Sequence, residues 1–142
     1  MTHANARSSE PNHLVARVTD AVVEASSRDA RVLAFYLLGS AAQDRLRHDS
    51  DVDIALMPMP GTVISSVERA GIANALSYRL RRTVDLGELS TRNLVYANEV
   101  LHTGALLYSR DPAATALIAA NLLGLYLEFN ERRQEVIRAF SL

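Results

Sequence analysis

Residues 32–57, VLAFYLLGSAAQDRLRHDSDVDIALM, decide the fold of this chain. Residues 32–38 form a short, uninterrupted apolar run, which is typical of a buried strand. Residues 41–47 suit one or two helical turns. From Asp51 to Met57 acidic and apolar residues alternate, as expected for a second strand. The segment therefore predicts two strands joined by a short helix.

Two carboxylates share one face of the second expected strand. Residues i and i+2 of a strand point to the same side, about 6–7 Å apart, so Asp51 and Asp53 project together while Val52 and Ile54 face the core. Neighbouring carboxylates repel, and one takes up a proton unless a cation lies between them. Oxygen ligands of this kind suit Mg²⁺ or Mn²⁺. A solvated strand edge is the simpler alternative, because an isolated Asp-x-Asp is common.

Gly39 and Ser40 follow the first expected strand and open the short helix. Glycine lets a ligand approach the backbone, and a helix N-terminus offers N–H donors to a phosphate. A phosphate site beside two metal-binding carboxylates is the arrangement used in phosphoryl or nucleotidyl transfer. Two cations about 3.5–4 Å apart would stabilise the attacking and leaving oxygens there.

A third acid lies in the expected strand formed by residues 83–86. Asp85 stands between two apolar residues and should face away from the core. On a strand next to Asp51 and Asp53 it would complete a triad that binds metal, and it would orient or deprotonate the attacking hydroxyl. A surface acid is the alternative interpretation, and the nearby Glu88 is expected in a turn.

The rest of the chain alternates helical and strand patterns, which predicts an α/β fold with a small mixed sheet flanked by helices. We expect a disordered N-terminus over residues 1–10 and a single domain over residues 11–142. Four helices are expected besides the short one, and the last two strands are short. The helices are expected over residues 11–29, 63–82, 92–102 and 112–140, and the strands over residues 32–38, 51–57, 83–86 and 105–108. Ser90 or Thr91 is the expected N-cap of the third of these helices, and Asp111 that of the last. The expected apolar face of the second consists of Val63, Val67, Ile72, Leu76 and Leu80.

Composition excludes several classes of function. The 142 residues carry a formal charge of −1, so there is no basic surface for nonspecific nucleic-acid binding. Cysteine and lysine are absent, which excludes thiolate chemistry and a P-loop lysine. The N-terminus lacks the apolar core of a secretory signal. The longest apolar stretch, residues 113–127, suits a buried helix better than a membrane span. We therefore expect a cytoplasmic protein with no membrane association.

Residues 37–56, LLGSAAQDRLRHDSDVDIAL, resemble the signature of the polymerase-β-like nucleotidyltransferases. That signature is Gly-Ser, ten residues, then Asp-x-Asp, with a later Asp. The short chain resembles the minimal nucleotidyltransferase (MNT) group, and in particular the antitoxins of the MntA type that are paired with HEPN-domain toxins. The order of features from Val32 to Tyr108 follows this family throughout.

The resemblance implies Mg²⁺-dependent transfer of AMP from ATP to a tyrosine hydroxyl of a HEPN toxin, which is thereby neutralised. By position, Gly39 and Ser40 would bind the triphosphate. Asp51 and Asp53 would bind both metal ions, and Asp85 would bind one of them and assist the nucleophile.

The chain departs from the family pattern just after Ser40. Members commonly have Arg-Gly three and four residues after the motif serine, whereas this chain has Gln43 and Asp44. A basic phosphate contact is lost, and Arg45 and Arg47 would have to replace it. The departure puts catalytic activity in question.

Two further functions therefore stay open. A catalytically weak domain would neutralise its partner by binding alone, and a small-molecule nucleotidyltransferase would need substrate-binding elements that this short chain hardly accommodates. The last expected helix, apolar on nearly all sides over residues 116–129, is either buried or a docking surface in a hetero-oligomer.

Overall fold

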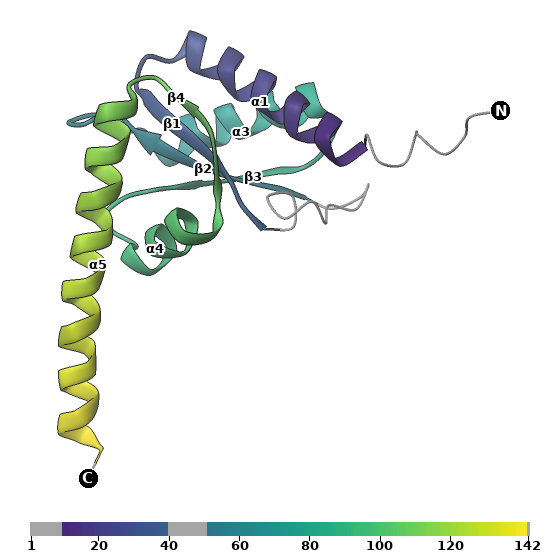
Figure 1. The fold of residues 1–142 in the computed structure, drawn as a ribbon. Helices are drawn as coiled ribbons and strands as arrows, with labels where there is room; N and C mark the ends of the chain where they lie inside the picture. The colour runs from purple at the N-terminus through teal and green to yellow at the C-terminus, as the bar shows by residue number, and fades with distance from the viewer. Residues whose placement is uncertain (1–9, 40–50, 142) are drawn as a thin grey trace.

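The computed structural model describes residues 10–39 and 51–141, and Figure 1 shows the arrangement of its helices and strands. The expected disordered segment up to residue 9 and the expected helical turns over residues 41–47 lie outside the described residues. The elements follow in the order α1 (Glu10–Arg28), β1 (Val32–Leu37), β2 (Val52–Pro58), α3 (Ser66–Leu80), β3 (Val84–Glu88), α4 (Leu94–Thr103), β4 (Ala105–Ser109) and α5 (Pro112–Phe140).

The strands that the structure describes form one mixed sheet in the order β3-β2-β1-β4. Strand β1 pairs antiparallel with β2 and β4, whereas β2 pairs parallel with β3. A parallel pair needs a long crossover connection, and α3 provides it between β2 and β3. The expected α/β class with a small mixed sheet flanked by helices is confirmed.

Helices cover both faces of the sheet (Figure 1). On one face, α1 and α3 pack against the strands around Val22, Ile54 and Leu76. On the other face, α4 and α5 pack around Met57 and Val100. All six residues of β1 are buried. Burial on both faces explains why this strand is a continuous apolar run rather than an alternating one.

Side-chain caps determine where the last two helices begin. Asp111 caps α5, as the sequence predicts. The predicted cap of α4 is wrong, because Asn93 rather than Ser90 or Thr91 accepts the hydrogen bond from the backbone N–H of Tyr96, at 3.1 Å. The Ser90 hydroxyl instead accepts from the backbone N–H two residues further on, at 3.2 Å. It stabilises the turn before the helix rather than the helix itself.

The predicted apolar face of the helix after β2 is only partly correct. Leu76 and Leu80 are each 2% exposed, but Val63 is 74% and Val67 79% exposed. Val63 precedes the helix, which begins at Ser66. Val67 lies five residues before Ile72, the next residue of the expected apolar face. At about 100° per residue, this spacing rotates Val67 by about 140° from that face.

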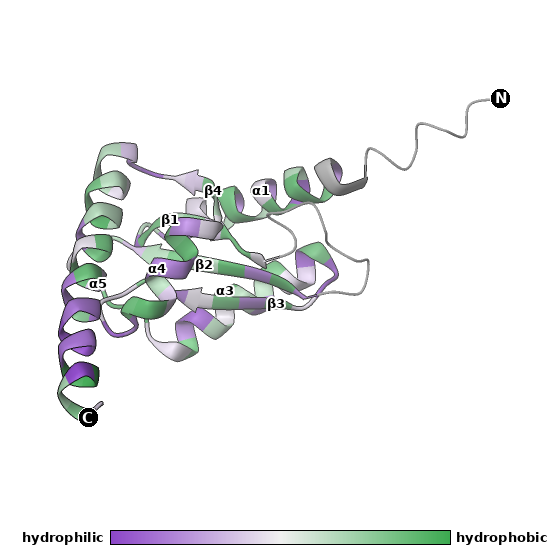
Figure 2. Cartoon of the chain, turned by 60° about the horizontal axis from the view of Figure 1, so that its bottom comes forward, coloured by the Kyte–Doolittle hydropathy of each residue, from purple (hydrophilic) through white to green (hydrophobic). Residues whose placement is uncertain are grey.

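Helix α5 extends well beyond the rest of the chain (Figure 1). Figure 2 shows that it is mainly apolar in its first half and more hydrophilic toward the C-terminus. Only 11% of its most apolar 18-residue window is buried, so the predicted burial of residues 113–127 is wrong for most of the helix. Within the described residues it is the one helix long and apolar enough to cross a membrane. Leu122 nevertheless packs in the same core as α4.

Candidate active site

The register of the parallel strands β2 and β3 brings two predicted site residues together. Asp53 and Asp85 are paired positions across the two strands. The backbone N–H of Val52 donates to the carbonyl of Thr83 at 2.9 Å, which extends the pairing to the start of both strands. Neighbouring strands lie about 4.8 Å apart. The two carboxylates are therefore held side by side on one face of the sheet.

The alternation of burial along both strands decides which face this is. Val52 and Ile54 are 0% and 1% exposed, and they belong with Val84 and Leu86 to the core covered by α1 and α3. Side chains of successive strand residues point to opposite faces, so Asp53 and its cross-strand neighbour project toward the side of α4. The predicted orientation of the acidic residues away from the core is confirmed.

The first residue of the Gly-Ser pair lies against these carboxylates. Gly39 has φ +69°, and a Cβ atom placed on it would lie 3.5 Å from Oδ2 of Asp53. The backbone N–H of Leu38 donates to the carbonyl of Asp53 at 2.9 Å, which fixes the end of β1 beside β2. A positive φ favours glycine, so the chain turns here at a position where a residue with a side chain would be strained.

Three residues predicted to bind the nucleotide, Ser40, Arg45 and Arg47, lie outside the described residues. The same is true of Gln43 and Asp44. The triphosphate contacts assigned to this segment therefore stay a prediction.

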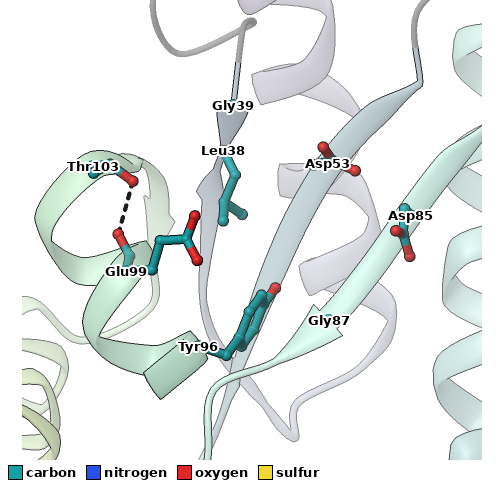
Figure 3. A pocket seen from close by; sticks show the side chains of 8 residues that line it. All are labelled: Leu38, Gly39, Asp53, Asp85, Gly87, Tyr96, Glu99 and Thr103. Carbon is teal, nitrogen blue, oxygen red and sulfur yellow. Dashed lines mark hydrogen bonds between the residues drawn. The ribbon is translucent and has the colours of Figure 1, made fainter. Parts of the chain in front are cut away.

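A pocket of about 550 Å³ opens at this end of the sheet. Figure 3 shows it between the ends of β1, β2 and β3 on one side and α4 on the other. The pocket contains two acidic residues predicted from the sequence, together with acidic and aromatic residues of α4 that were not predicted. It is lined by Leu38, Gly39, Asp53, Asp85, Gly87, Tyr96, Glu99 and Thr103.

Burial and neighbouring charge raise the pKa values of two groups in the pocket. Burial raises the pKa of the Asp53 carboxyl above its usual 3.8, and the charges of Asp85 and Asp51 raise it further. Burial also raises the pKa of the Tyr96 hydroxyl to about 12, and the nearby carboxylates of Asp85, Asp53 and Glu99 add to this. The pocket therefore disfavours additional negative charge unless a cation accompanies it.

The metal ligands predicted from the sequence are only partly assembled. Asp51 precedes β2, is exposed and does not line the pocket. Among residues 10–39 and 51–141, no three acidic or histidine side chains are grouped so that they form a metal site by themselves. The pair Asp53 and Asp85 nevertheless fits Mg²⁺, which typically takes one or two carboxylates and completes its shell with water and substrate phosphates.

The sequence alone did not place Tyr96 or Gly87 in the site, and the two residues depend on each other. A Cβ atom on Gly87 would lie 2.1 Å from the Tyr96 hydroxyl and 2.6 Å from its Cζ atom. The tyrosine ring thus lies directly over the glycine. Glycine inside a strand often marks such a close approach, and this was the available signal, but the predicted strand ended at Leu86.

Comparison with known proteins gives a consistent result. The family described as "Polymerase beta, Nucleotidyltransferase" matches residues 21–113. A protein adenylyltransferase, MntA, of Shewanella oneidensis is 28% identical over 102 residues, which span 72% of this chain and 71% of that protein.

Solved structures share the fold. A toxin–antitoxin complex with AMP-PNP contains a chain with a TM-score of 0.73 and 22% identity, covering 87% of this chain and 98% of that one. A complex of tri-AMPylated Shewanella oneidensis HEPN toxin with an MNT antitoxin gives a TM-score of 0.68 and 21% identity, covering 88% of this chain and 97% of that one.

Asp53→Asn is expected to stabilise the metal-free chain. Because the pKa of Asp53 is raised in the folded state, stability falls as pH rises through the range between the ordinary and the raised value. Removing the charge at pH 7 should raise the free energy of unfolding, by at most about 1 kcal/mol since solvent screens an exposed carboxylate. Urea unfolding at pH 7 and at pH 3 measures this. A variant less stable than the parent at pH 7 would contradict the electrostatic account.

Gly87→Ala is expected to destabilise the chain by about 1–3 kcal/mol, because the added methyl group overlaps the Tyr96 ring and forces it out of place. Gly71→Ala is the matched control. Gly71 lies inside α3 with open space around it, so alanine there should stabilise by up to about 1 kcal/mol. In thermal and urea unfolding, the free energy of unfolding should therefore fall in Gly87→Ala and rise in Gly71→Ala. Equal effects from both substitutions would show that the tyrosine ring is not packed on Gly87.

Proposed function

Because this chain belongs to the polymerase beta nucleotidyltransferase family, we propose that it is a Mg²⁺-dependent protein adenylyltransferase. It transfers AMP from ATP to a tyrosine hydroxyl of a partner HEPN toxin and thereby neutralises that toxin. The observation that carries the proposal is the pairing of Asp53 with Asp85 beside Gly39, in a pocket of about 550 Å³.

The chain's own residues have distinct tasks in the proposed reaction. The tyrosine hydroxyl of the partner attacks the α-phosphorus of ATP in line, and pyrophosphate leaves. Asp85 holds the attacking hydroxyl and accepts its proton. The positive φ of Gly39 leaves the backbone free to contact phosphate. Asp53 and Asp85 would hold Mg²⁺, which would supply charge neutralisation for the phosphates.

The charge of the pocket supports the use of a cation. Asp53, Asp85 and Glu99 line it, and none of the described lining residues is basic. A triphosphate brought alone into such a site would be repelled by three carboxylates. ATP therefore has to enter together with divalent metal. Mn²⁺ has the same preference for oxygen ligands and should replace Mg²⁺.

The acceptor approaches from the edge of the sheet at β3. This strand is the outermost one on the side of Asp85, while Gly39 lies on the far side of Asp53. A second pocket of about 340 Å³ adjoins the first at Gly87 and Tyr96 and is also lined by Arg69 and Arg92. This second pocket would hold the residues next to the acceptor tyrosine of the partner, so that the tyrosine hydroxyl lies beside Asp85.

Helix α5 supplies the docking surface for the partner. Phe129, Val136 and Phe140 are 43%, 56% and 86% exposed, and their spacings of seven and four residues place them on one face of the helix. The MntA-type chains that share this fold are found in complexes with HEPN toxins. An isolated helical extension is marginally stable in water, so a partner that covers this face would also stabilise it.

A second candidate function is neutralisation by docking alone. It is favoured by the exposed apolar face of α5, which exists independently of the catalytic pocket, and by Gln43 and Asp44, where the family commonly has Arg-Gly. In either case the chain acts in the cytoplasm, where ATP is available.

Incubation of the chain with ATP, Mg²⁺ and its partner HEPN toxin should add AMP to the toxin. Intact-mass measurement and peptide mapping should place the added AMP on tyrosine. Asp53→Asn and Asp85→Asn should each lower the rate at least about 100-fold, because one loses a metal ligand and the other also loses the base. Glu24→Gln on α1, whose side chain lies in a groove on the opposite face of the sheet, is the control and should retain the rate.

Toxin neutralisation that survives Asp53→Asn, without any mass change in the parent reaction, would contradict the enzyme proposal and support docking alone. Loss of neutralisation together with loss of AMP transfer would support the enzyme.

Val136→Asp and Phe140→Asp are expected to weaken the complex with the toxin by at least about tenfold each, since they place a charge on the proposed apolar interface. Isothermal titration calorimetry measures the affinity. Val67→Asp is the matched control, because Val67 is 79% exposed on α3. All three variants should fold normally. Unchanged affinity in both α5 variants would place the docking surface elsewhere.

A further inference from the structure

Tyr96 is a phenol held inside the catalytic pocket by its own chain. It is carried by α4, and Figure 3 shows its hydroxyl directed toward the ends of β2 and β3, where Asp53 and Asp85 lie. The residue is half-buried. Its ring packs partly buried between α4 and the sheet, which fixes the residue in the lining of the pocket.

The position of the hydroxyl along β3 is known from the glycine beneath it. A Cβ atom on Gly87 would lie 2.1 Å from this oxygen. Gly87 is two residues after Asp85 on the same strand, so the two positions share a face and lie about 6–7 Å apart. The phenolic oxygen therefore lies within one side-chain length of the proposed base.

The hydroxyl has no hydrogen-bond partner among the described residues, whereas the backbone N–H of Tyr96 is bonded to the Asn93 side chain. A buried or half-buried tyrosine usually places its O–H on a partner. Here the groups around it are the carboxylates of Asp53, Asp85 and Glu99 that line the same pocket. A free phenol beside a proton-accepting carboxylate has the chemistry of an acceptor in nucleotidyl transfer.

We propose that Tyr96 is itself an AMP acceptor, so that the chain adenylylates its own pocket when the partner tyrosine is absent. The inference rests on the proposed function, because it uses the same nucleotide and the same carboxylates.

The step balances in atoms and charge. A bond forms between the Tyr96 phenolic oxygen and the α-phosphorus of ATP, while the bond from that phosphorus to the bridging oxygen of the β-phosphate breaks. Pyrophosphate leaves with the electron pair of the broken bond. The phenolic proton passes to the carboxylate of Asp85 and from there to water. The product is a tyrosine–AMP phosphodiester inside the pocket, where it blocks entry of another ATP.

The other tyrosines of the chain are placed differently. Tyr36 is 7% exposed and belongs to the core between the sheet and α4. Tyr78 is 90% exposed on α3 and lines a groove with α1 on the opposite face of the sheet. Tyr108 packs against the core on the side of α1 and α3. Tyr96 is the one tyrosine among the described residues that lines the catalytic pocket.

The test is incubation of the purified full chain with ATP and Mg²⁺ in the absence of any partner. Intact mass should increase by one AMP moiety, and peptide mapping should place it on Tyr96. The rate constant should not depend on chain concentration, because the acceptor is intramolecular. Tyr96→Phe should remove the modification while keeping the ring over Gly87, and Asp53→Asn should remove it as well. Tyr78→Phe is the matched control and should retain it.

A second measurement does not require turnover. In a chain with isotope-labelled tyrosine rings, Mg²⁺ with α,β-methylene ATP, which cannot transfer AMP, should shift the ring resonance of Tyr96 and leave that of Tyr78 unchanged. No shift at Tyr96 would overturn the proposal, because the nucleotide would then bind away from the phenol.

The outcomes separate this inference from the function on which it rests. AMP found on the toxin but never on Tyr96 overturns self-modification and leaves the proposed function intact. AMP on Tyr78, or a rate that rises with chain concentration, also overturns it, since the reaction would then be intermolecular. Absence of AMP from both the toxin and the chain overturns both proposals.

Discussion

The register between β2 and β3 is the constraint on which the rest of this structure depends. It places Asp53 directly opposite Asp85, an arrangement that repulsion between like charges opposes. Burial of Val52, Ile54 and Leu86 on the other face of the same strands holds it in place. A slip of either strand by one residue would turn the carboxylate of that strand toward the core and its apolar side chains toward the pocket. The hydrophobic core therefore enforces the electrostatic strain of the site.

This strain accounts for the ligand preference that we propose for the pocket. Its carboxylates come from two strands and a helix, and the raised pKa of Asp53 reflects burial and the neighbouring acids. A metal ion that enters together with a polyphosphate would neutralise the charges of the pocket carboxylates and of the phosphates. The polyphosphate alone would be repelled by the carboxylates. The same charges leave the Tyr96 hydroxyl protonated at neutral pH, with a pKa of about 12. A phenol in this pocket, from a partner or from the chain itself, needs a carboxylate to accept its proton.

Local patterns predicted most elements because their causes are local. The apolar run of β1, the alternation in β2 and the Asp111 cap of α5 all appear where the sequence places them. Predictions failed where a distant contact decided the outcome. Val67 is apolar like a core residue, yet the orientation of α3 against the sheet leaves its side chain exposed. The cap of α4 is a local exception, because Asn93 accepts the hydrogen bond from the backbone N–H of Tyr96 while Ser90 accepts one within the preceding turn.

The sequence by itself determined the α/β fold, the acidic residues of the proposed site and their orientation away from the core. These features follow from the order of residues because successive side chains of a strand point to opposite faces. Tertiary structure alone decided that Asp53 faces Asp85 while Asp51 does not line the pocket. It also decided that Tyr96 rests on Gly87 and that α5 is largely exposed. These outcomes depend on strand register and helix placement, which arise from contacts between residues far apart in the chain.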